Sequence, residues 1–288
     1  MNILVTGSSG FIGSKAVEYF ISRSHKVWGL SRSNEKQLRT THYQFIRADL
    51  SKEIPFLPRI DVCIHAAAES PVTGKNKKDF YNNNVVATQN LLEGLNRSGC
   101  EHLIFTSAVS AYGDIKHATI SEVTEVQPNS VYGMTKLLAE QHIRERGNFK
   151  VTVLRLPGVL GDGASSIWVI RLIQAAIKNK KLYIYNPNAP FNNAVDIGSL
   201  VKFFHALAIG YQDNSHELYL LASSGQLTIS QIVEKIIAET NSSSTVEFIE
   251  GRNSFTLDCR KATKNGYDPP LLSTIIENQI NIELNRPI

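Results

Sequence analysis

Residues 2–13 read NILVTGSSGFIG. An apolar run typical of a buried strand opens this segment, and the amphipathic stretch from Phe11 onward is typical of a helix. Gly7, Gly10 and Gly13 lie in the connection between them. Their spacing, G-x-x-G-x-x-G, is one residue longer at the first gap than the G-x-G-x-x-G fingerprint of dinucleotide-binding turns. We therefore predict a strand, a glycine-rich turn and a helix at the start of the chain.

Each glycine of this turn has its own expected role. Gly7 can adopt a tight-turn conformation, Gly10 lets backbone amides approach a phosphate closely, and Gly13 lets the helix pack on the sheet. The helix N-terminus adds partial positive charge. The turn thus predicts a site for the pyrophosphate of a dinucleotide, made by Gly7, Ser9, Gly10, Phe11, Ile12 and Gly13. The alternative is a strand-to-helix turn that uses glycine for geometry alone.

The order of strand then helix continues through the first half of the chain. Strands are predicted at residues 2–6, 26–30, 43–47, 61–67, 102–107 and 150–155, and helices at 11–24, 79–98 and 130–146. Gly99 follows the second helix, where a C-terminal glycine is expected. This alternation requires a parallel sheet covered by helices on both faces, joined by right-handed crossovers. We expect an α/β fold, a Rossmann-type doubly wound parallel sheet with a smaller C-terminal α/β substrate lobe.

The alternation loosens after Arg155, where glycines and prolines interrupt the pattern. We therefore assign residues 1–160, plus about 190–210, to a dinucleotide-binding domain. Residues of about 161–189 and 211–288 are assigned to a substrate-binding lobe. The absence of a low-complexity linker predicts that the two lobes pack closely.

Composition excludes several classes of protein. The 288 residues are 42% hydrophobic and 19% charged, which is an ordinary globular composition. A net charge of +4 is too small and too dispersed to require a nucleic-acid partner. Three widely spaced cysteines form neither a disulfide framework nor a zinc motif. With neither a signal peptide nor a long apolar run in the sequence, we expect a cytoplasmic protein that has no membrane or metal partner.

The end of the second predicted strand bears on the choice of cofactor. A carboxylate at this point holds the ribose 2′-hydroxyl of NAD, but the chain reads Leu30-Ser31-Arg32-Ser33. Arg32 between two hydroxyls instead suits the 2′-phosphate of NADP. We predict NADP, with NAD possible because Arg32 can also be an ordinary exposed residue beside a neutral pocket.

Two segments match the pattern Y-x-x-x-K, at residues 112–116 and 132–136. Only the second begins a predicted helix, where an i, i+4 pair lies on one face. A neighbouring ammonium favours the phenolate, so Lys136 is expected to lower the pKa of Tyr132 toward a range useful for proton exchange. A tyrosine packed in the core beside a solvated lysine is the structural alternative.

Taken together, these residues resemble the extended short-chain dehydrogenase/reductases, also called the NAD-dependent epimerase/dehydratase family. The resemblance covers nearly the whole chain, and its motifs follow the family's order. They are the cofactor turn Thr6 to Gly13, the adenine-contacting segment Ala48-Asp49-Leu50, the strand end His65-Ala66-Ala67-Ala68, the helix opened by Asn84, the pair Tyr132 and Lys136, the segment Arg155 to Val159, and the terminal segment Asp258 to Pro269.

The resemblance implies roles for residues of this chain. Tyr132 would be the acid/base and Lys136 would tune it and hold the nicotinamide ribose. Further cofactor contacts would come from Asp49, Leu50, Ala66, Ala67, Ala68, Asn84 and Pro157. The family usually places a catalytic Ser or Thr where this chain has Ala108, so we favour Ser107, with Ser110 close behind, and keep open that neither serves.

The expected function is that of an NAD(P)-dependent oxidoreductase, epimerase or dehydratase. It would act by hydride transfer on a sugar nucleotide or a related carbonyl/alcohol substrate. The resemblance further implies a homodimer formed through two helices. Asn192, Asn193 and Arg252 are candidates to hold a nucleotide diphosphate. A protein of the same fold that binds NADP as a sensor or scaffold, without catalysis, is the alternative.

Overall fold

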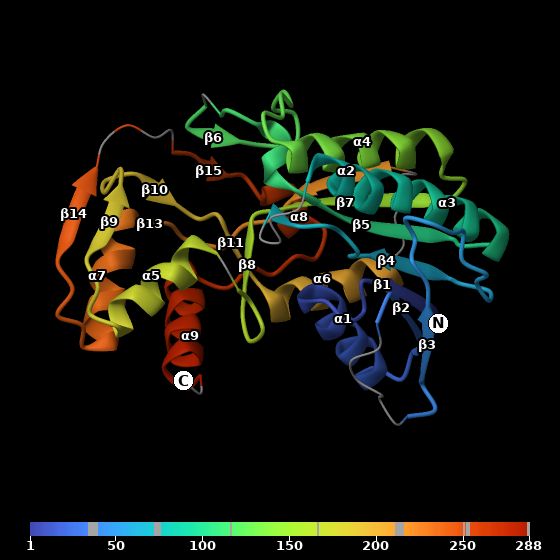
Figure 1. Ribbon diagram of the computed structural model, residues 1–288, viewed down its shortest axis with the longest axis horizontal. Helices are drawn as coiled ribbons and strands as arrows, with labels where there is room; N and C mark the ends of the chain where they lie inside the picture. Colours follow the sequence, from blue (N-terminus) through green and yellow to red (C-terminus); the bar gives the residue numbers. More distant parts are fainter. Residues whose placement is uncertain are drawn as a thin grey trace. The chain divides into compact units, whose positions relative to one another are not determined.

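The computed structural model describes residues 1–33, 40–71, 76–115, 117–165, 167–210, 216–249, 251 and 254–286. These form two compact units (Figure 1). The first unit comprises Met1–Gly113, Glu125–Arg155 and Leu200–Tyr219, and the second comprises Asp114–Thr124, Leu156–Ser199 and Leu220–Ile288.

A seven-stranded sheet forms the centre of the first unit. Its order is β12-β7-β5-β4-β1-β2-β3, and β1 pairs in parallel with both β2 and β4, as do β2 with β3 and β4 with β5. The bounds are β1 Asn2–Thr6, β2 Lys26–Ser31, β3 Tyr43–Arg47, β4 Val62–His65, β5 His102–Ala108, β7 Lys150–Leu156 and β12 His216–Leu220. Strand order reverses between β1 and β4, which is the point where doubly wound sheets bind ligands. The predicted fold class is confirmed.

Helices cover both faces of this sheet. Figure 1 shows α2 (Lys77–Tyr81), α3 (Ala87–Ser98) and α4 (Val131–Arg146) on one face. Helix α1 (Phe11–Ser22) and the part of α6 (Ile197–Ile209) that belongs to the first unit lie on the other. The interior between the sheet and the upper helices is apolar, and its buried members include Leu4, Trp28, Leu91, Phe105 and Ile143.

The helix predicted over residues 79–98 differs from the structure in one respect. A π-helical turn, Asn82–Val86, separates α2 from α3, so the segment is not one continuous α-helix. The expected end is confirmed, because Gly99 caps α3 in the left-handed conformation with φ of 69°. The side chain of Ser130 caps α4 by accepting the Gly133 N–H at 3.0 Å.

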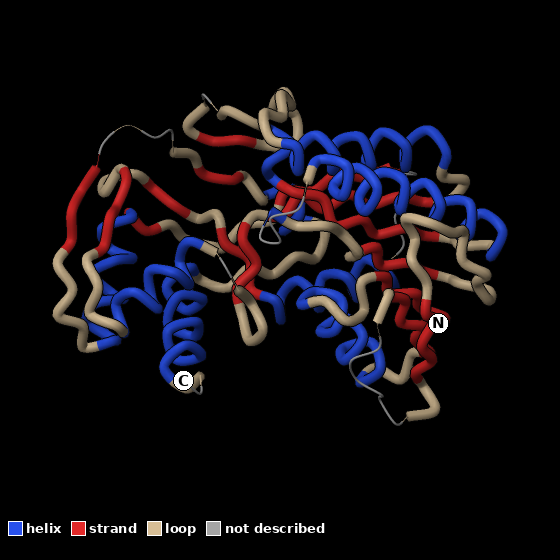
Figure 2. Tube along the Cα trace, viewed as in Figure 1, coloured by secondary structure: helices blue, strands red, loops and turns tan. Residues whose placement is uncertain are grey.

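The second unit contains paired short strands and helices, as Figure 2 shows by colour. Strand β8 (Gly158–Leu160) pairs with β11 (Ala194–Asp196), β9 (Leu182–Tyr185) with β14 (Val246–Ile249), β10 (Pro190–Phe191) with β13 (Leu227–Thr228), and β6 (Thr119–Ile120) with β15 (Thr256–Leu257). Its helices are α5 (Trp168–Ile177), α7 (Ile229–Thr240), α8 (Arg260–Lys264) and α9 (Leu272–Leu284).

The compact units divide the chain differently from the domains expected from the sequence. Residues 190–199 group with the second unit because β11 pairs with β8, although we had assigned them to the dinucleotide-binding domain. Residues 114–124 also group there, because β6 pairs with β15. Both pairings join segments distant in sequence, which local patterns do not reveal. Among the described residues, no helix has the length and apolar character needed to cross a membrane.

Candidate active site

The glycine turn forms a close-packed corner between β1 and α1. Gly7 adopts φ of +66°, and a Cβ there would lie 2.8 Å from the backbone of Ala67 at the end of β4. A Cβ on Gly13 would lie 2.6 Å from the carbonyl carbon of Gly7. Gly13 therefore lets the helix pack on the turn itself, a closer neighbour than the sheet that we expected. The Gly10 N–H donates to the Gly7 carbonyl at 2.8 Å, which fixes the turn.

A cavity of about 220 Å³ opens beside this turn within the first unit. Nine of the residues predicted to bind a cofactor line it: Gly7, Ser9, Gly10, Arg32, Asp49, Leu50, Ala66, Ala67 and Ala68. Phe11, Ile12, Gly13, Asn84, Tyr132 and Lys136 belong to the same unit but lie outside that lining, whereas Pro157 belongs to the second unit. Ser31 and Ser33, the hydroxyls expected beside Arg32, also line it. Sequence reasoning missed further lining residues, among them Glu69, which follows a predicted strand, and Asn83 and Ala87, which lie in the helix predicted over residues 79–98.

Among the described residues that line the cavity next to β2, Arg32 is the cation. Arg32 is exposed there, and the Ser31 hydroxyl donates to the Ser33 carbonyl at 2.6 Å. Asp49, from the segment after β3, accepts from the backbone N–H and the hydroxyl of Ser51 and pairs with Lys52 at 3.3 Å. The Ser51 hydrogen bonds and Lys52 outweigh partial desolvation and lower the pKa of Asp49. The Asp49 carboxylate therefore already accepts hydrogen bonds from Ser51 and pairs with Lys52 within its own turn.

Asn84 joins this cavity to helix α4. Its side chain accepts the Glu69 N–H at 2.7 Å and donates both to the Glu69 carbonyl at 3.2 Å and to Thr135 Oγ1 at 3.0 Å. Thr135 in turn donates to the Tyr132 carbonyl. The π-helical turn that carries Asn84 thus fixes the first turns of α4, consistent with the frequent occurrence of such turns at functional sites.

Tyr132, Lys136 and Glu140 follow one another at i, i+4 and i+8 on α4 and so share a face. Lys136 is 2% exposed, and its Nζ lies 4.1 Å from the centre of the Phe105 ring. Burial lowers the pKa of Lys136 to about 7, although Glu140 acts in the opposite direction. Burial also raises the pKa of Tyr132 to about 12. The expected lowering for Tyr132 is wrong for the protein alone, because burial of the phenol itself favours its neutral form.

A buried ionic network lies one helical turn beyond Lys136. Arg155 donates to Glu140 through Nε at 3.1 Å and Nη2 at 2.7 Å, and the Ser107 hydroxyl donates to the same carboxylate. The guanidinium also lies 4.7 Å from the centre of the Tyr112 ring. Tyr112 is therefore a core residue, and Lys116 of its Y-x-x-x-K segment lies outside the described residues. The hydroxyl of Ser107 is already committed to Glu140.

Histidines at strand ends serve the core. His65 bridges Thr6 Oγ1 at 2.7 Å and Thr88 Oγ1 at 3.0 Å, and burial lowers its pKa to about 3. Within the described ranges, no group of three or more His, Cys, Asp or Glu side chains could hold a metal ion.

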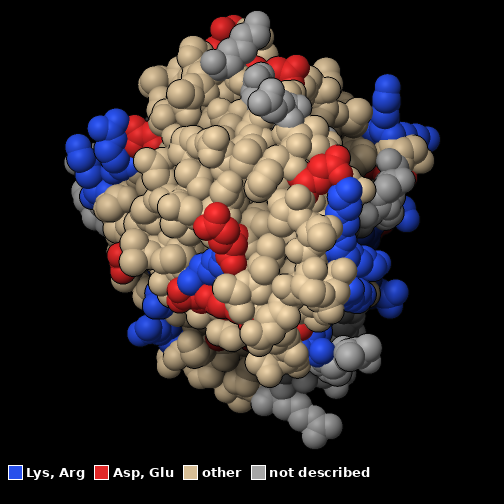
Figure 3. Space-filling model, turned by 90° about the vertical axis from the view of Figure 1, so that its left-hand side faces the viewer, with Lys and Arg blue, Asp and Glu red and all other residues tan. Residues whose placement is uncertain are grey.

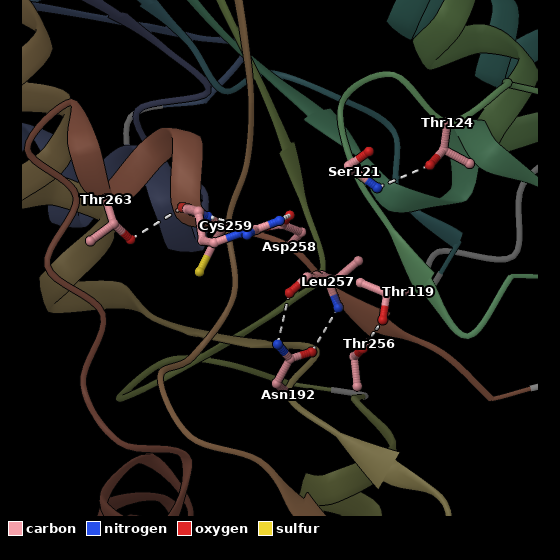
Figure 4. Close-up of polar contacts among 10 residues, drawn as sticks. Thr119, Ser121, Thr124, Asn192, Thr256, Leu257, Asp258, Cys259 and Thr263 are labelled. Atoms are coloured by element: carbon pink, nitrogen blue, oxygen red, sulfur yellow. Dashed lines mark hydrogen bonds and ion pairs between the residues drawn. The ribbon is translucent and has the colours of Figure 1, made fainter.

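Asn192 and Asn193 bind backbone within the second unit. Asn192 accepts the Leu257 N–H at 2.8 Å and donates to the Leu257 carbonyl at 2.9 Å (Figure 4). Asn193 Nδ2 donates to the Phe255 carbonyl at 3.1 Å. The third candidate, Arg252, lies outside the described residues.

An aromatic cavity of about 430 Å³ lies in the second unit. The rings of Trp168, Tyr183, Tyr185, Phe191 and Phe255 contribute to its lining, together with Asn193. The Oδ1 atom of Asn193 is buried and accepts no hydrogen bond from the described residues. Figure 3 shows that the face of the molecule bearing β9 and β14 is largely uncharged, with a cluster of acidic and basic side chains near its middle and further basic side chains toward its margins. The cavity therefore offers aromatic rings, the unused acceptor of Asn193 and the cationic side chain of Arg171 to a ligand.

A family model described as "NAD dependent epimerase/dehydratase family" matches residues 3–217. The chain belongs to this family. A UDP-glucose 4-epimerase 2 from Oryza sativa subsp. japonica is 30% identical over 162 residues, which cover 50% of this chain and 40% of that protein. An uncharacterized UDP-glucose epimerase from Bacillus subtilis is 27% identical and is matched over 93% of each chain. The solved UDP-glucuronic acid 4-epimerase from Bacillus cereus in complex with NAD is 27% identical, with a TM-score of 0.83 over 98% of this chain and 96% of that one.

Membership of the NAD dependent epimerase/dehydratase family confirms the resemblance drawn from the motifs. The protein is an enzyme of the hydride-transferring type, and a sensor or scaffold without catalysis is not favoured. Its cofactor is a nicotinamide dinucleotide. The residues at the glycine turn fit such a group, because Gly7 and Gly10 line the 220 Å³ cavity and, having no side chains, leave only backbone at its edge.

Proposed function

We propose that this protein is an epimerase of UDP-linked sugars and that Tyr132 and Lys136 carry its proton chemistry. The observation that supports this most directly is that Tyr132, half-buried, and Lys136, fully buried, share one face of α4. A lysine buried one helical turn from a tyrosine is costly unless it serves a function. The solved Bacillus cereus relative in complex with NAD is a UDP-glucuronic acid 4-epimerase.

When bound, the cofactor supplies the acceptor and donor of hydride at its nicotinamide ring. The protein residues then handle the proton. Tyr132 removes the proton from the sugar hydroxyl as the carbon is oxidised and returns it to the ketone oxygen as the opposite face of that carbon is reduced. The proton that Tyr132 takes in the first half-reaction is the one it returns in the second, so no outside proton is needed. Lys136 lies one helical turn away, and its ammonium form favours the phenolate of Tyr132 that accepts this proton.

The aromatic cavity of the second unit is our candidate for the base of the nucleotide. Uracil is flat and carries an N–H donor, which Asn193 Oδ1 can accept. Aromatic rings in the lining can stack on its faces. Of the polar atoms that line this cavity, Asn193 Oδ1 is one whose hydrogen-bonding capacity is unused within the described part of the chain.

NADP is our proposal for the preferred form of the cofactor, with NAD as a second form. Arg32 lies at the rim beside two hydroxyls, and no carboxylate belongs to residues 30–33 at the end of β2. A guanidinium there favours a 2′-phosphate over a 2′-hydroxyl. A homodimeric assembly and a cytoplasmic location stay predictions. The second of these rests on three free cysteines, two of which are buried.

Turnover measured by mass spectrometry tests the proposal. Wild type and Tyr132→Phe are each given NADP(H) or NAD(H) with UDP-, GDP- and dTDP-linked hexoses and their keto forms. We expect conversion of a UDP-sugar to its epimer by wild type and its loss in the Phe variant. Conversion only of GDP-sugars, or equal turnover by Tyr132→Phe, would show that the assignment of substrate or residue is wrong.

A further inference from the structure

Strand β2 contains Gly29, whose missing side chain leaves room for two residues from other elements. A Cβ there would overlap the hydroxyl of Tyr43 from β3 and would lie 2.9 Å from the Cβ of Ser8 in the glycine turn. Tyr43 pairs directly with Val27, so its ring extends diagonally along β2 to reach Gly29. The phenol of Tyr43 thus meets Ser8 over Gly29, toward the end of β2 that borders the cofactor cavity.

The Tyr43 hydroxyl and the Ser8 side chain form a hydrogen bond, in which either hydroxyl can donate. Burial raises the pKa of Tyr43, although the bond to Ser8 acts in the opposite direction. The phenol is therefore neutral at physiological pH and retains the proton that the bond can use. Tyr43 is not among the described residues that line the cavity, so its influence on a cofactor has to pass through the turn.

Ser8 joins two walls of the cofactor cavity. Its neighbours in the turn, Gly7 and Ser9, line the cavity on one side, and Leu30 lines it from the end of β2. The Ser8 N–H donates to the Leu30 carbonyl at 3.3 Å, and Ser8 as a whole is buried. The backbone of Ser8 therefore connects the turn to β2, while Tyr43 holds its side chain from β3.

A turn with three glycines is costly to hold in one conformation, because glycine loses more conformational freedom on ordering than any other residue. A ligand binds only the fraction of molecules whose site is already in the competent conformation, and its apparent Kd rises as that fraction falls. A side-chain hydrogen bond that restrains Ser8 increases this fraction before any ligand arrives.

We propose that Tyr43 is a positioning residue for the dinucleotide cofactor. Through Ser8, its hydroxyl holds the glycine turn in the conformation that receives the pyrophosphate. Gly29 is required for this arrangement, because any side chain at that position would displace the phenol. The inference goes beyond the proposed function and rests on cofactor binding alone.

Titration calorimetry of the free protein with NADP and with NAD tests the proposal. Tyr43→Phe keeps the ring and removes the hydroxyl, and we expect the Kd of both cofactors to rise about 3–10-fold, the factor that one intramolecular hydrogen bond supplies. Backbone amides of the turn should exchange hydrogen faster in the free variant and regain protection at saturating cofactor. Ser8→Ala should raise Kd by a similar factor. The double variant should show no further rise, because both changes remove the same bond.

Tyr19→Phe is the matched control. Tyr19 is also half-buried, and its hydroxyl accepts a hydrogen bond from Arg23 at 3.2 Å on α1. This variant should keep the wild-type Kd.

A Kd for Tyr43→Phe within twofold of wild type would overturn the inference, even with a lower thermal midpoint, because Tyr43 would then contribute to stability alone. Additive losses in the double variant, or an equal rise for Tyr19→Phe, would overturn it as well. Calorimetry needs no sugar substrate, so a failure to convert UDP-sugars is a separate result that leaves these affinities measurable.

Discussion

The buried pair of Glu140 and Arg155 allows a quantitative prediction about stability. Their side chains are only 4% and 5% exposed, and the guanidinium contacts the carboxylate through two nitrogens at 2.7 and 3.1 Å. Removing one member of such a pair leaves a buried charge without a counterion and typically costs about 3–5 kcal/mol. Glu140→Gln keeps the volume and an acceptor oxygen, so we expect the lower value, about 3 kcal/mol of the free energy of unfolding.

Replacing both partners should recover most of that loss. The double variant Glu140→Leu with Arg155→Met puts apolar side chains in place of both charges, and such replacements are often neutral or stabilising. We expect its free energy of unfolding to lie within about 1–2 kcal/mol of wild type. The exposed pair Glu93 and Arg97 provides the control, because its side chains are 53% and 70% exposed. Glu93→Gln should cost less than about 1 kcal/mol.

Urea unfolding followed by tryptophan fluorescence can measure these differences. The chain has two tryptophans, Trp28 in the first unit and Trp168 in the second. A Trp168→Phe background makes the signal report on the unit that contains the ion pair. A loss for Glu140→Gln no larger than that for Glu93→Gln would refute the reasoning. A double variant less stable than both single variants would refute it as well.

Three further predictions concern the pH dependence of stability, the cofactor and the turn. Because burial lowers the pKa of Lys136 to about 7 in the folded state, from its ordinary value of 10.5 in the unfolded chain, the unfolded chain binds more protons between these pH values. The free energy of unfolding of wild type, relative to that of Lys136→Met, should therefore rise from pH 7 to about pH 10. Thermal melts of both proteins across this pH range measure the difference. If the two proteins show the same pH dependence, the burial of this amine is contradicted. Arg32→Leu should weaken NADP binding by about tenfold or more and leave NAD binding unchanged, as titration calorimetry would show. Arg97→Leu, at an exposed position, is the control. If Arg32→Leu lowers the affinity for NAD as much as the affinity for NADP, Arg32 does not select the 2′-phosphate. Gly13→Ala should abolish cofactor binding and lower the thermal midpoint, since the new methyl group meets the Gly7 carbonyl. Gly99→Ala, with φ of +69° and open space around it, should cost only about 1 kcal/mol and leave binding intact.

Much of the first unit follows from local patterns. Strands β1 and β3 have the predicted bounds, and β2, β5 and β7 each extend one residue further. Hydrophobic periodicity and the turn residues determine these elements, since each strand is short and all of them except β3 are largely buried. Strand β4 is shorter than predicted because the backbone after His65 leaves the sheet to pass beside Gly7.

The parts that could not be predicted depend on contacts between distant residues. The segment around Asn84 contains no local signal for a π-helical turn, and the Asn84 side chain within that turn is held by Thr135, 51 positions away. The direction of the pKa shift of Tyr132 depends on how deeply its side chain is buried. The i, i+4 spacing between Tyr132 and Lys136 gives no information about that burial. The hydrogen bond that the Ser107 hydroxyl donates likewise depends on a distant residue, Glu140, 33 residues further along the chain.

The central sheet also has a consequence for synthesis on the ribosome. Strand β1 pairs with β2 and also with β4, which lies about 60 residues further along the chain. Helix α4, which carries Tyr132, follows later still. A nascent chain therefore contains the glycine turn long before it contains the strand that packs against it, and the cofactor has no complete cavity to enter until β4 has emerged. The early apolar strands remain unpaired on one side during that interval, when they are most exposed to aggregation and to chaperones.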